Sequence, residues 1–252
     1  MLDIEDVTIT FGGVTALDGV GLQVPDRSIV GLIGPNGAGK TTLFNCVTRA
    51  YQPDAGAISF DDTDLLGLAK HQIVDAGIAR TFQNLALFGS MTVLENTMVG
   101  AHSARRPRIV PSLVGWPTAR RYAREVGDRA REVLASLELE DVAEREVGGL
   151  PFGTLKRVEL ARALMSDPRL LLLDEPAGGL THSEVDDLGR VIEGLCRDRG
   201  IAILLVEHHM GLVMGISDRV VAMEFGRKIA EGDPTAVQQD PRVIQAYLGG
   251  AA

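Results

Sequence analysis

Residues 34–42 read GPNGAGKTT, and this stretch decides the fold of the chain. It matches the pattern G-x-x-x-x-G-K-[ST], a loop whose successive backbone N–H groups surround phosphate oxygens. The lysine of the pattern supplies positive charge and the following hydroxyl can bind Mg²⁺. An apolar stretch at 28–33 predicts a buried strand before the loop, and 41–47 predicts a helix whose N-terminus faces the anion. This context argues against a chance glycine-rich turn, so we expect a nucleoside triphosphate at Gly34, Pro35, Asn36, Gly37, Ala38, Gly39, Lys40, Thr41 and Thr42.

A second motif, LLLLDEP at 170–176, is an apolar strand that ends in two acids. Carboxylates at the carboxyl end of a strand are well placed for metal and water chemistry in an α/β sheet. We therefore expect Asp174 to orient the Mg²⁺ shell, together with Thr41, and Glu175 to polarise an attacking water. The alternative is a strand that ends in an ordinary polar turn, and the phosphate loop disfavours it.

The pattern of apolar residues in the rest of the chain predicts that strands alternate with helices, and this alternation indicates a mostly parallel sheet. We expect every site residue to lie at the carboxyl edges of its strands. The predicted strands are 2–9, 29–33, 57–60, 170–174, 201–206 and a hairpin at 220–231 that turns at Gly226. The predicted helices are 41–47, 93–99, 119–137, 155–164 and 183–199, and two short ones that follow Pro234 and Pro241.

Together these motifs resemble the nucleotide-binding subunit of ATP-binding-cassette (ABC) transporters, and the resemblance covers essentially the whole chain. It implies an α/β, ABC-type P-loop NTPase with a mostly parallel core sheet, an N-terminal antiparallel β portion and an inserted helical lobe. It also implies ATP and Mg²⁺ as ligands. We expect one nucleotide-binding domain at 1–252, with its core at 1–86 and 147–252 and the helical lobe at 87–146.

The resemblance assigns roles to several further residues. Phe11 stands where the family stacks an aromatic ring on adenine, although a ring so near a strand could equally be core. Gln83 stands in the Q-loop, where the amide reaches Mg²⁺ and water. His208 matches the histidine that contacts the γ-phosphate, with His209 as the competing candidate. Residues 178–181 occupy the D-loop, which crosses the dimer interface in the family.

The signature segment departs from the family pattern Leu-Ser-Gly-Gly-Gln, because this chain reads LPFGT at 150–154. Pro151 has neither a hydroxyl nor an N–H group, so the usual serine contact with the γ-phosphate cannot form there. Gly153 and Thr154 can still offer a backbone N–H and a hydroxyl at a helix N-terminus. We expect these two residues to bind nucleotide, with reduced strength.

Composition supports a globular α/β domain: 252 residues, 45% hydrophobic and 23% charged, can bury a large core. The net charge of −9 argues against nucleic acid as a partner. No apolar stretch approaches the ~20 residues that span a bilayer, and the N-terminus lacks a secretion pattern, so we expect a cytoplasmic protein. Cys46 and Cys196 are expected to be reduced. The basic segment 105–124 is either a solvated face or a surface for permease or lipid.

Three further stretches, at 77–84, 91–96 and 240–249, resemble the ATPases of branched-chain amino acid importers. Importers of urea or short amides share this appearance. The resemblance implies a second cassette, identical or paralogous, transmembrane permease subunits, an extracytoplasmic solute-binding protein, and a peripheral position on the inner face of the membrane. A soluble ABC ATPase without transport is an alternative, but the chain has neither two cassettes nor long heptad insertions. A regulator with little hydrolysis is another, and Glu175 argues against it.

Overall fold

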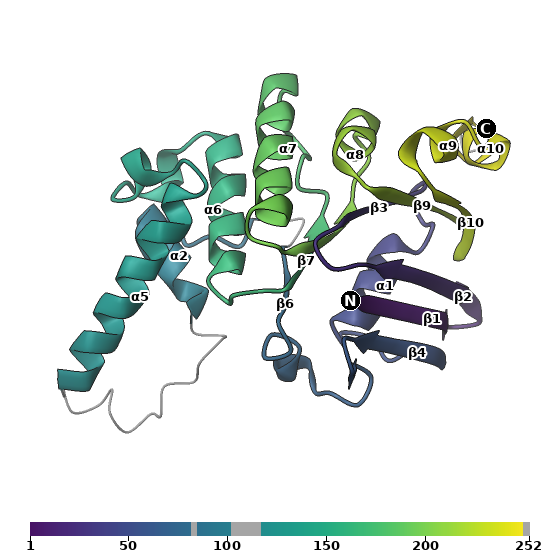
Figure 1. Cartoon of the computed structure of the whole chain (residues 1–252), viewed down its shortest axis with the longest axis horizontal. Coiled ribbons are helices and arrows are strands. Elements are labelled where there is room, and N and C mark those ends of the chain that lie inside the picture. Colours follow the sequence, from purple (N-terminus) through teal and green to yellow (C-terminus); the bar gives the residue numbers. More distant parts are fainter. Residues whose placement is uncertain (82–84, 102–116, 249–252) are drawn as a thin grey trace.

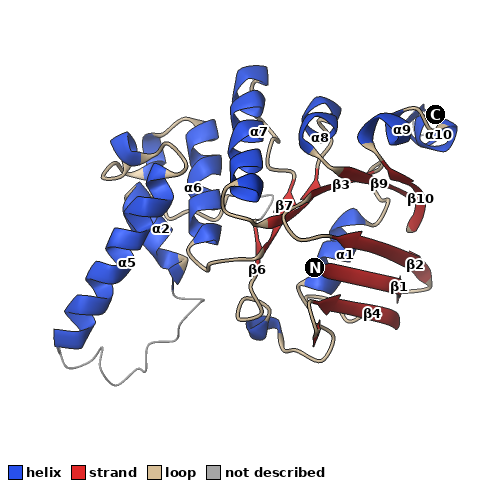
Figure 2. Cartoon of the chain, viewed as in Figure 1, coloured by secondary structure: helices blue, strands red, loops and turns tan. Residues whose placement is uncertain are grey.

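The computed structural model describes residues 1–81, 85–101 and 117–248, which form two β-sheets surrounded by helices (Figure 1). Of the predictions above, Gln83 and the stretch 105–116 lie outside the described residues. The two sheets, coloured red in Figure 2, lie close together at one end of the molecule, and a group of helices forms the other end.

The larger sheet has six strands in the order β10-β9-β3-β8-β7-β6. β3, β6, β7, β8 and β9 pair in parallel, and β10 pairs antiparallel with β9. The mostly parallel core sheet and the terminal hairpin are therefore confirmed. The strands are β3 (Ile29–Ile33), β6 (Ile78–Arg80), β7 (Leu170–Asp174), β8 (Ala202–Val206), β9 (Arg219–Glu224) and β10 (Arg227–Gly232).

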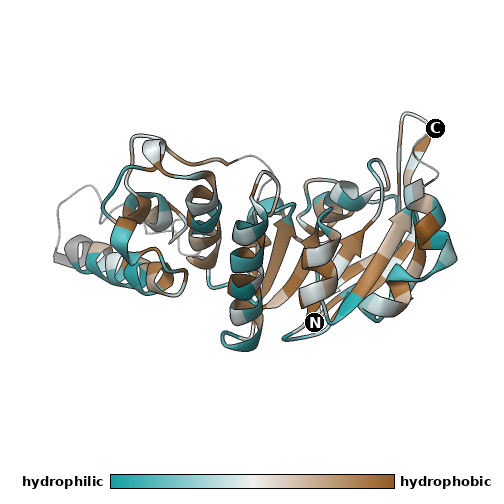
Figure 3. Ribbon diagram, turned by 90° about the horizontal axis from the view of Figure 1, so that it is seen from above, coloured by the Kyte–Doolittle hydropathy of each residue, from teal (hydrophilic) through white to brown (hydrophobic). Residues whose placement is uncertain are grey.

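Both faces of this sheet are buried, which explains why its central strands are continuously apolar. Alternate residues of β8 enter two different cores. Ile203 and Leu205 pack into the core on one face of the sheet, whereas Leu204 and Val206 pack into the core on the other face. α7 (His182–Arg197) and α8 (Met210–Ile216) contribute to the first core, and α1 (Lys40–Val47) contributes to the second. Figure 3 shows the resulting band of hydrophobic strands behind the helices that cover the first of these faces.

The smaller sheet is antiparallel, with the strand order β2-β1-β4-β5, and it confirms the predicted antiparallel portion. β2 was not predicted, because Asp18, Gly19 and Gly21 interrupt its apolar pattern and Gly19 has a φ of +62°. Pairing along β1 nevertheless holds the segment in a strand, with three register shifts. The strands are β1 (Leu2–Phe11), β2 (Val14–Val24), β4 (Ala55–Phe60) and β5 (Thr63–Asp64).

Three helices at the other end of the molecule pack on one another: α2 (Val93–Val99), α5 (Pro117–Ala135) and α6 (Phe152–Leu164). Their buried residues join the core that also covers α7 and β7, so this end continues the main core. Two short helices, α9 (Pro234–Gln238) and α10 (Pro241–Leu248), follow β10. None of the helices described is both long enough and apolar enough to cross a membrane.

The expectation that every site residue lies at the carboxyl edge of a strand in the parallel sheet is wrong. Phe11 ends β1 of the antiparallel sheet, and Gly153 and Thr154 lie in the first turn of α6, so these three residues do not follow strands of the parallel sheet. Helix α6 also begins three residues earlier than predicted, at Phe152, because Pro151 is well suited to the position that precedes a first helical turn. The phosphate loop, Asp174, Glu175 and His208 do lie at the carboxyl ends of β3, β7 and β8.

Candidate functional site

The phosphate loop connects β3 to α1, and its glycines are required by its conformation. Gly39 has a φ of +98°, a left-handed conformation that turns the chain into α1. At Gly34 a Cβ atom would lie 2.2 Å from the carbonyl oxygen of Met223, so no side chain fits against β9. The N-terminus of α1 carries N–H groups without intrahelical acceptors, which suits an anion.

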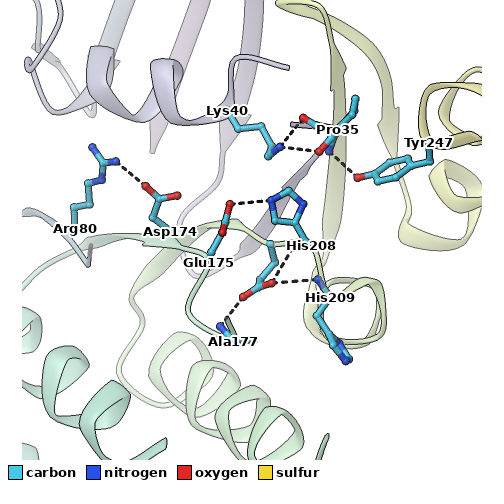
Figure 4. Close-up of polar contacts among 11 residues, drawn as sticks. Pro35, Lys40, Arg80, Asp174, Glu175, Ala177, His208, His209 and Tyr247 are labelled. Carbon is cyan, nitrogen blue, oxygen red and sulfur yellow. Dashed lines mark hydrogen bonds and ion pairs between the residues drawn. The ribbon is translucent and has the colours of Figure 1, made fainter. Parts of the chain in front are cut away.

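Lys40 is buried, with 6% of its surface exposed, and its charged end lies inside the loop. Nζ donates hydrogen bonds to the carbonyl oxygens of Gly34 at 2.7 Å and Pro35 at 3.0 Å (Figure 4). Burial lowers the pKa of Lys40, while the nearby carboxylates of Glu175 and Asp174 act in the opposite direction. Its two partners are neutral carbonyl oxygens. Charged phosphate oxygens would bind the ammonium group more strongly.

Glu175 and His208 meet in front of the loop. The Nε2 atom of His208 lies 2.8 Å from Oε1 of Glu175, and because a carboxylate only accepts, Nε2 carries the proton. Glu175 has a φ of +50°, so its backbone adopts the left-handed conformation at the end of β7. Its N–H group donates to the carbonyl of Val206 at 2.8 Å, which ties the end of β7 to β8.

His209 has a different position from His208. It is the N-cap of α8, and its Nδ1 atom accepts a hydrogen bond from the N–H of Leu212 at 3.2 Å. Its ring lies edge-on to His182, with centroids 5.8 Å apart. The structure therefore brings His208, and not His209, to Glu175.

Asp174 lies beside Glu175 and forms a buried ion pair that the sequence did not predict. Arg80, the last residue of β6, donates from Nη2 to Oδ2 of Asp174 at 2.7 Å, and the two side chains are 11% and 5% exposed. The same guanidinium donates from Nη1 to Oδ1 of Asn45 at 2.7 Å and lies 5.4 Å from the ring centre of Phe44. Arg80 thus holds the Asp174 carboxylate close to α1.

Two more residues of the site could not be inferred from spacing. Glu207, directly before His208, is 2% exposed and accepts a backbone hydrogen bond from Ala177. Tyr247, on α10, accepts a hydrogen bond through its hydroxyl from the N–H of Gly34 at 2.8 Å. Burial raises the pKa of the Tyr247 hydroxyl, and the hydrogen bond from Gly34 opposes this effect. An acid at the end of an apolar strand was a signal for Glu207, but none pointed to Tyr247.

The other predicted nucleotide-binding residues lie apart from this cluster. Phe11 is 45% exposed and contacts Tyr51 edge-on, with ring centroids 5.1 Å apart, so it is not part of the core. At the signature segment, Gly153 is buried, and a Cβ atom there would lie 2.6 Å from Oε1 of Glu184. Strands β6 and β7 lie between α6 and α1, so the signature of this chain does not face its own phosphate loop (Figure 1).

The residues present fit a magnesium-bound triphosphate. The glycine loop approaches β9 closely and leads into the N-terminus of α1, a buried lysine supplies charge, and the oxygens of Thr41 and Asp174 are ligands that Mg²⁺ prefers. Mg²⁺ is usually held by one or two carboxylates and by substrate phosphates, so this small donor set is sufficient.

The fold and the site define a P-loop ATPase of the ATP-binding-cassette type. Residues 17–178 match the ABC transporter family, and residues 227–252 match a family described as branched-chain amino acid ATP-binding cassette transporter. The chain belongs to the ABC transporter family, within its group of ATP-hydrolysing ATP-binding subunits.

Relatives and solved structures match almost the full length of the chain. The chain is 43% identical to the high-affinity branched-chain amino acid transport ATP-binding protein BraF of Pseudomonas aeruginosa, over 100% of the chain and 98% of the relative. It is 42% identical to LivG of Escherichia coli, which has the same description, over the same shares. The crystal structure of the ADP conformation of MJ1267, an ATP-binding cassette of an ABC transporter, has a TM-score of 0.86 at 32% identity, over 99% of this chain and 98% of that one.

Proposed function

We propose that this chain hydrolyses ATP to energise the import of branched-chain amino acids across the cell membrane. The observation that carries the chemistry is the contact between Glu175 and His208 beside the buried Lys40. The solute is supported by kinship: BraF and LivG are named for branched-chain amino acid transport, and they match this chain along its whole length. The match at 227–252 supports the same solute over urea or short amides.

In this proposal the phosphate loop binds the triphosphate. Backbone N–H groups of the loop and of the first turn of α1 would hold the phosphates, and Lys40 would exchange its carbonyl partners for phosphate oxygens. Thr41 and Asp174, with Gln83 from the Q-loop, would hold Mg²⁺, which supplies neutralisation of charge on the phosphates. Phe11 would stack on the adenine, since its ring is exposed.

Glu175 acts on the attacking water. Its carboxylate accepts the proton that the water loses, and the N–H of His208 orients the carboxylate until the γ-phosphate is bound. Because an Nε2–H group can donate to a phosphate oxygen as well as to Glu175, His208 would then contact the γ-phosphate.

A second cassette, identical or paralogous, completes each site. The signature residues Gly153 and Thr154 lie in the first turn of α6, whose N–H groups lack intrahelical acceptors and suit a phosphate that another chain holds. MJ0796, a bacterial ABC transporter cassette described as dimeric, has a TM-score of 0.78 to this chain at 25% identity. Such a dimer would work with transmembrane permeases on the inner face of the membrane and, through them, with an extracytoplasmic solute-binding protein.

Reconstitution of the transporter in vesicles tests this function. The chain, its second cassette and the permeases are inserted in vesicles loaded with ATP and Mg²⁺, and the solute-binding protein is added outside. We expect uptake of labelled leucine, isoleucine and valine that Glu175→Gln abolishes. Uptake of urea or acetamide in place of leucine would contradict the proposed solute, and ATP hydrolysis without uptake of any of these would favour a role outside transport.

A further inference from the structure

Glu207 is a buried carboxylate between two loops of the site. It follows β8 directly, and only 2% of its surface is exposed. Its Oε1 atom accepts a hydrogen bond from the N–H of Ala177 at 2.6 Å. Its Oε2 atom accepts from the N–H groups of His208 at 2.8 Å and His209 at 3.1 Å. Figure 4 shows how close Ala177, His208 and His209, which supply these N–H groups, lie to one another.

Burial of a carboxylate is costly unless its charge is compensated. Within the part of the chain that the structure describes, Glu207 forms no ion pair, and its compensation consists of these three backbone N–H groups. Bonds from N–H groups to an ionised acceptor are stronger than bonds between neutral groups. A buried acid with three such bonds therefore fixes the backbone segments that supply them.

These segments carry the two reacting side chains. Ala177 comes two residues after Glu175, and His208 follows Glu207 directly. The ladder between β7 and β8 ends where the Glu175 N–H group donates to Val206, so Glu207 continues the connection beyond the sheet. The two loops are therefore joined twice: by the contact between the side chains of Glu175 and His208, and by the bonds of Glu207 to the backbone of Ala177 and His208.

We propose that Glu207 is a positioning residue for ATP hydrolysis: it fixes the distance between the Glu175 loop and the His208 loop. This inference rests on the proposed roles of Glu175 and His208. Glu207 itself does not touch substrate in this assignment. Its effect is exerted through the two backbone segments that it joins.

Glu207→Gln is the sharpest test, because it changes charge and one acceptor but little volume. Its amide has a single acceptor oxygen, so either Ala177 or the two histidines would face an NH₂ group. We expect kcat for ATP to fall about tenfold or more, the factor that loss of one hydrogen bond to a charged group produces. KM for ATP should change less than about threefold, since Lys40 and the phosphate loop are untouched.

A matched control is Glu231→Gln, which also replaces a hydrogen-bonded carboxylate by an amide, but on β10. It should leave kcat and KM unchanged. The double variant Glu207→Gln with His208→Ala separates positioning from mere destabilisation. If Glu207 acts through His208, the double variant should be no slower than His208→Ala alone.

Three results would overturn the inference: a kcat of Glu207→Gln within about twofold of the parent, a loss confined to KM, or additive losses in the double variant. If Glu207→Gln does not fold, Glu207→Asp takes its place in the same assays. It keeps the charge, but its side chain is one methylene shorter and cannot reach all three N–H groups. Glu175→Gln is measured in parallel. Normal turnover in Glu175→Gln would refute the proposed function itself, whereas loss there with normal turnover in Glu207→Gln would refute only this inference.

Discussion

The Nε2 atom of His208 lies 2.8 Å from Oε1 of Glu175, although the two residues are 33 positions apart in the chain. The contact joins the ends of two neighbouring parallel strands, β7 and β8. It places a proton donor on one oxygen of the expected general base. In the proposed function, His208 leaves Glu175 for a phosphate oxygen when the nucleotide binds, and this exchange would control hydrolysis.

Glu175→Gln should bind ATP normally and hydrolyse it about 10²- to 10⁴-fold more slowly, because the amide cannot accept the proton of the water. Turnover and nucleotide affinity are measured on the same preparation. Lys40→Ala should instead lose affinity, and Glu132→Gln, an exposed residue on α5, should resemble the parent in both. Turnover of Glu175→Gln within tenfold of the parent would exclude the role as general base.

His208→Ala and His209→Ala should have different effects. We expect His208→Ala to lower kcat without a change in stability, because its ring is partly exposed and bonds only Glu175 in the described residues. His209→Ala should lower the free energy of unfolding by about 1 kcal/mol, because α8 loses its N-cap. His209→Asn, a good N-cap, should restore it. The assignment fails if His209→Ala is the variant that loses turnover at normal stability.

Arg80→Met should lower the free energy of unfolding by about 3 to 5 kcal/mol, because it leaves the buried Asp174 carboxylate without its partner. Arg121→Met is the matched control. Arg121 pairs with Glu125 on the surface of α5, with side chains 83% and 61% exposed, so it should cost less than about 1 kcal/mol. Chemical denaturation of the three proteins measures both values, and equal losses would mean that Arg80 contributes no more than a surface pair.

Tyr247→Phe should weaken ATP binding roughly twofold to tenfold, the effect of one neutral hydrogen bond. It removes only the hydroxyl that accepts from Gly34, whose carbonyl in turn accepts from Lys40. Arg242→Ala on the same helix, paired only with Asp240 in the part of the chain described, is the control. Unchanged nucleotide affinity in Tyr247→Phe would show that α10 supports the fold but not the phosphate loop.

The stability of the protein should fall as the pH rises from about 9 to about 11, in part because of Cys46. Burial raises the pKa of this thiol to about 11. Between these values the unfolded chain loses the thiol proton and the folded chain keeps it, so the free energy of unfolding falls with pH. The contribution of Cys46 is at most roughly 2 to 3 kcal/mol.

Denaturation of Cys46→Ala at several pH values should therefore show a shallower decline than the parent. Ser166→Ala, a small substitution without a titrating group, should decline as steeply as the parent. Parallel curves for the parent and Cys46→Ala would mean that the thiol does not contribute to this dependence.

The sequence predicted the parts of the site that lie within continuous motifs. The phosphate loop, Asp174 and Glu175 each come at the end of an apolar strand, and parallel strands bring their carboxyl ends to one edge, so local pattern was enough. His208 also follows an apolar strand, but its role came from the family resemblance. β2 was missed because only its pairing with β1 overrides its glycines. Arg80 and Tyr247 were missed because their partners, Asp174 and Gly34, are 94 and 213 positions away, and only the folded chain brings them together.

The place of β3 in the sheet has a consequence for the synthesis of the protein. β3 carries the phosphate loop, yet its two neighbours are β8 and β9, which begin at Ala202 and Arg219. A ribosome that adds about 5 to 20 residues per second needs roughly 8 to 35 s to pass from the end of β3 to the start of β8. During that interval β3, whose five residues are all buried in the folded protein, has neither neighbour, so the nascent chain carries an unpaired apolar strand through most of its synthesis.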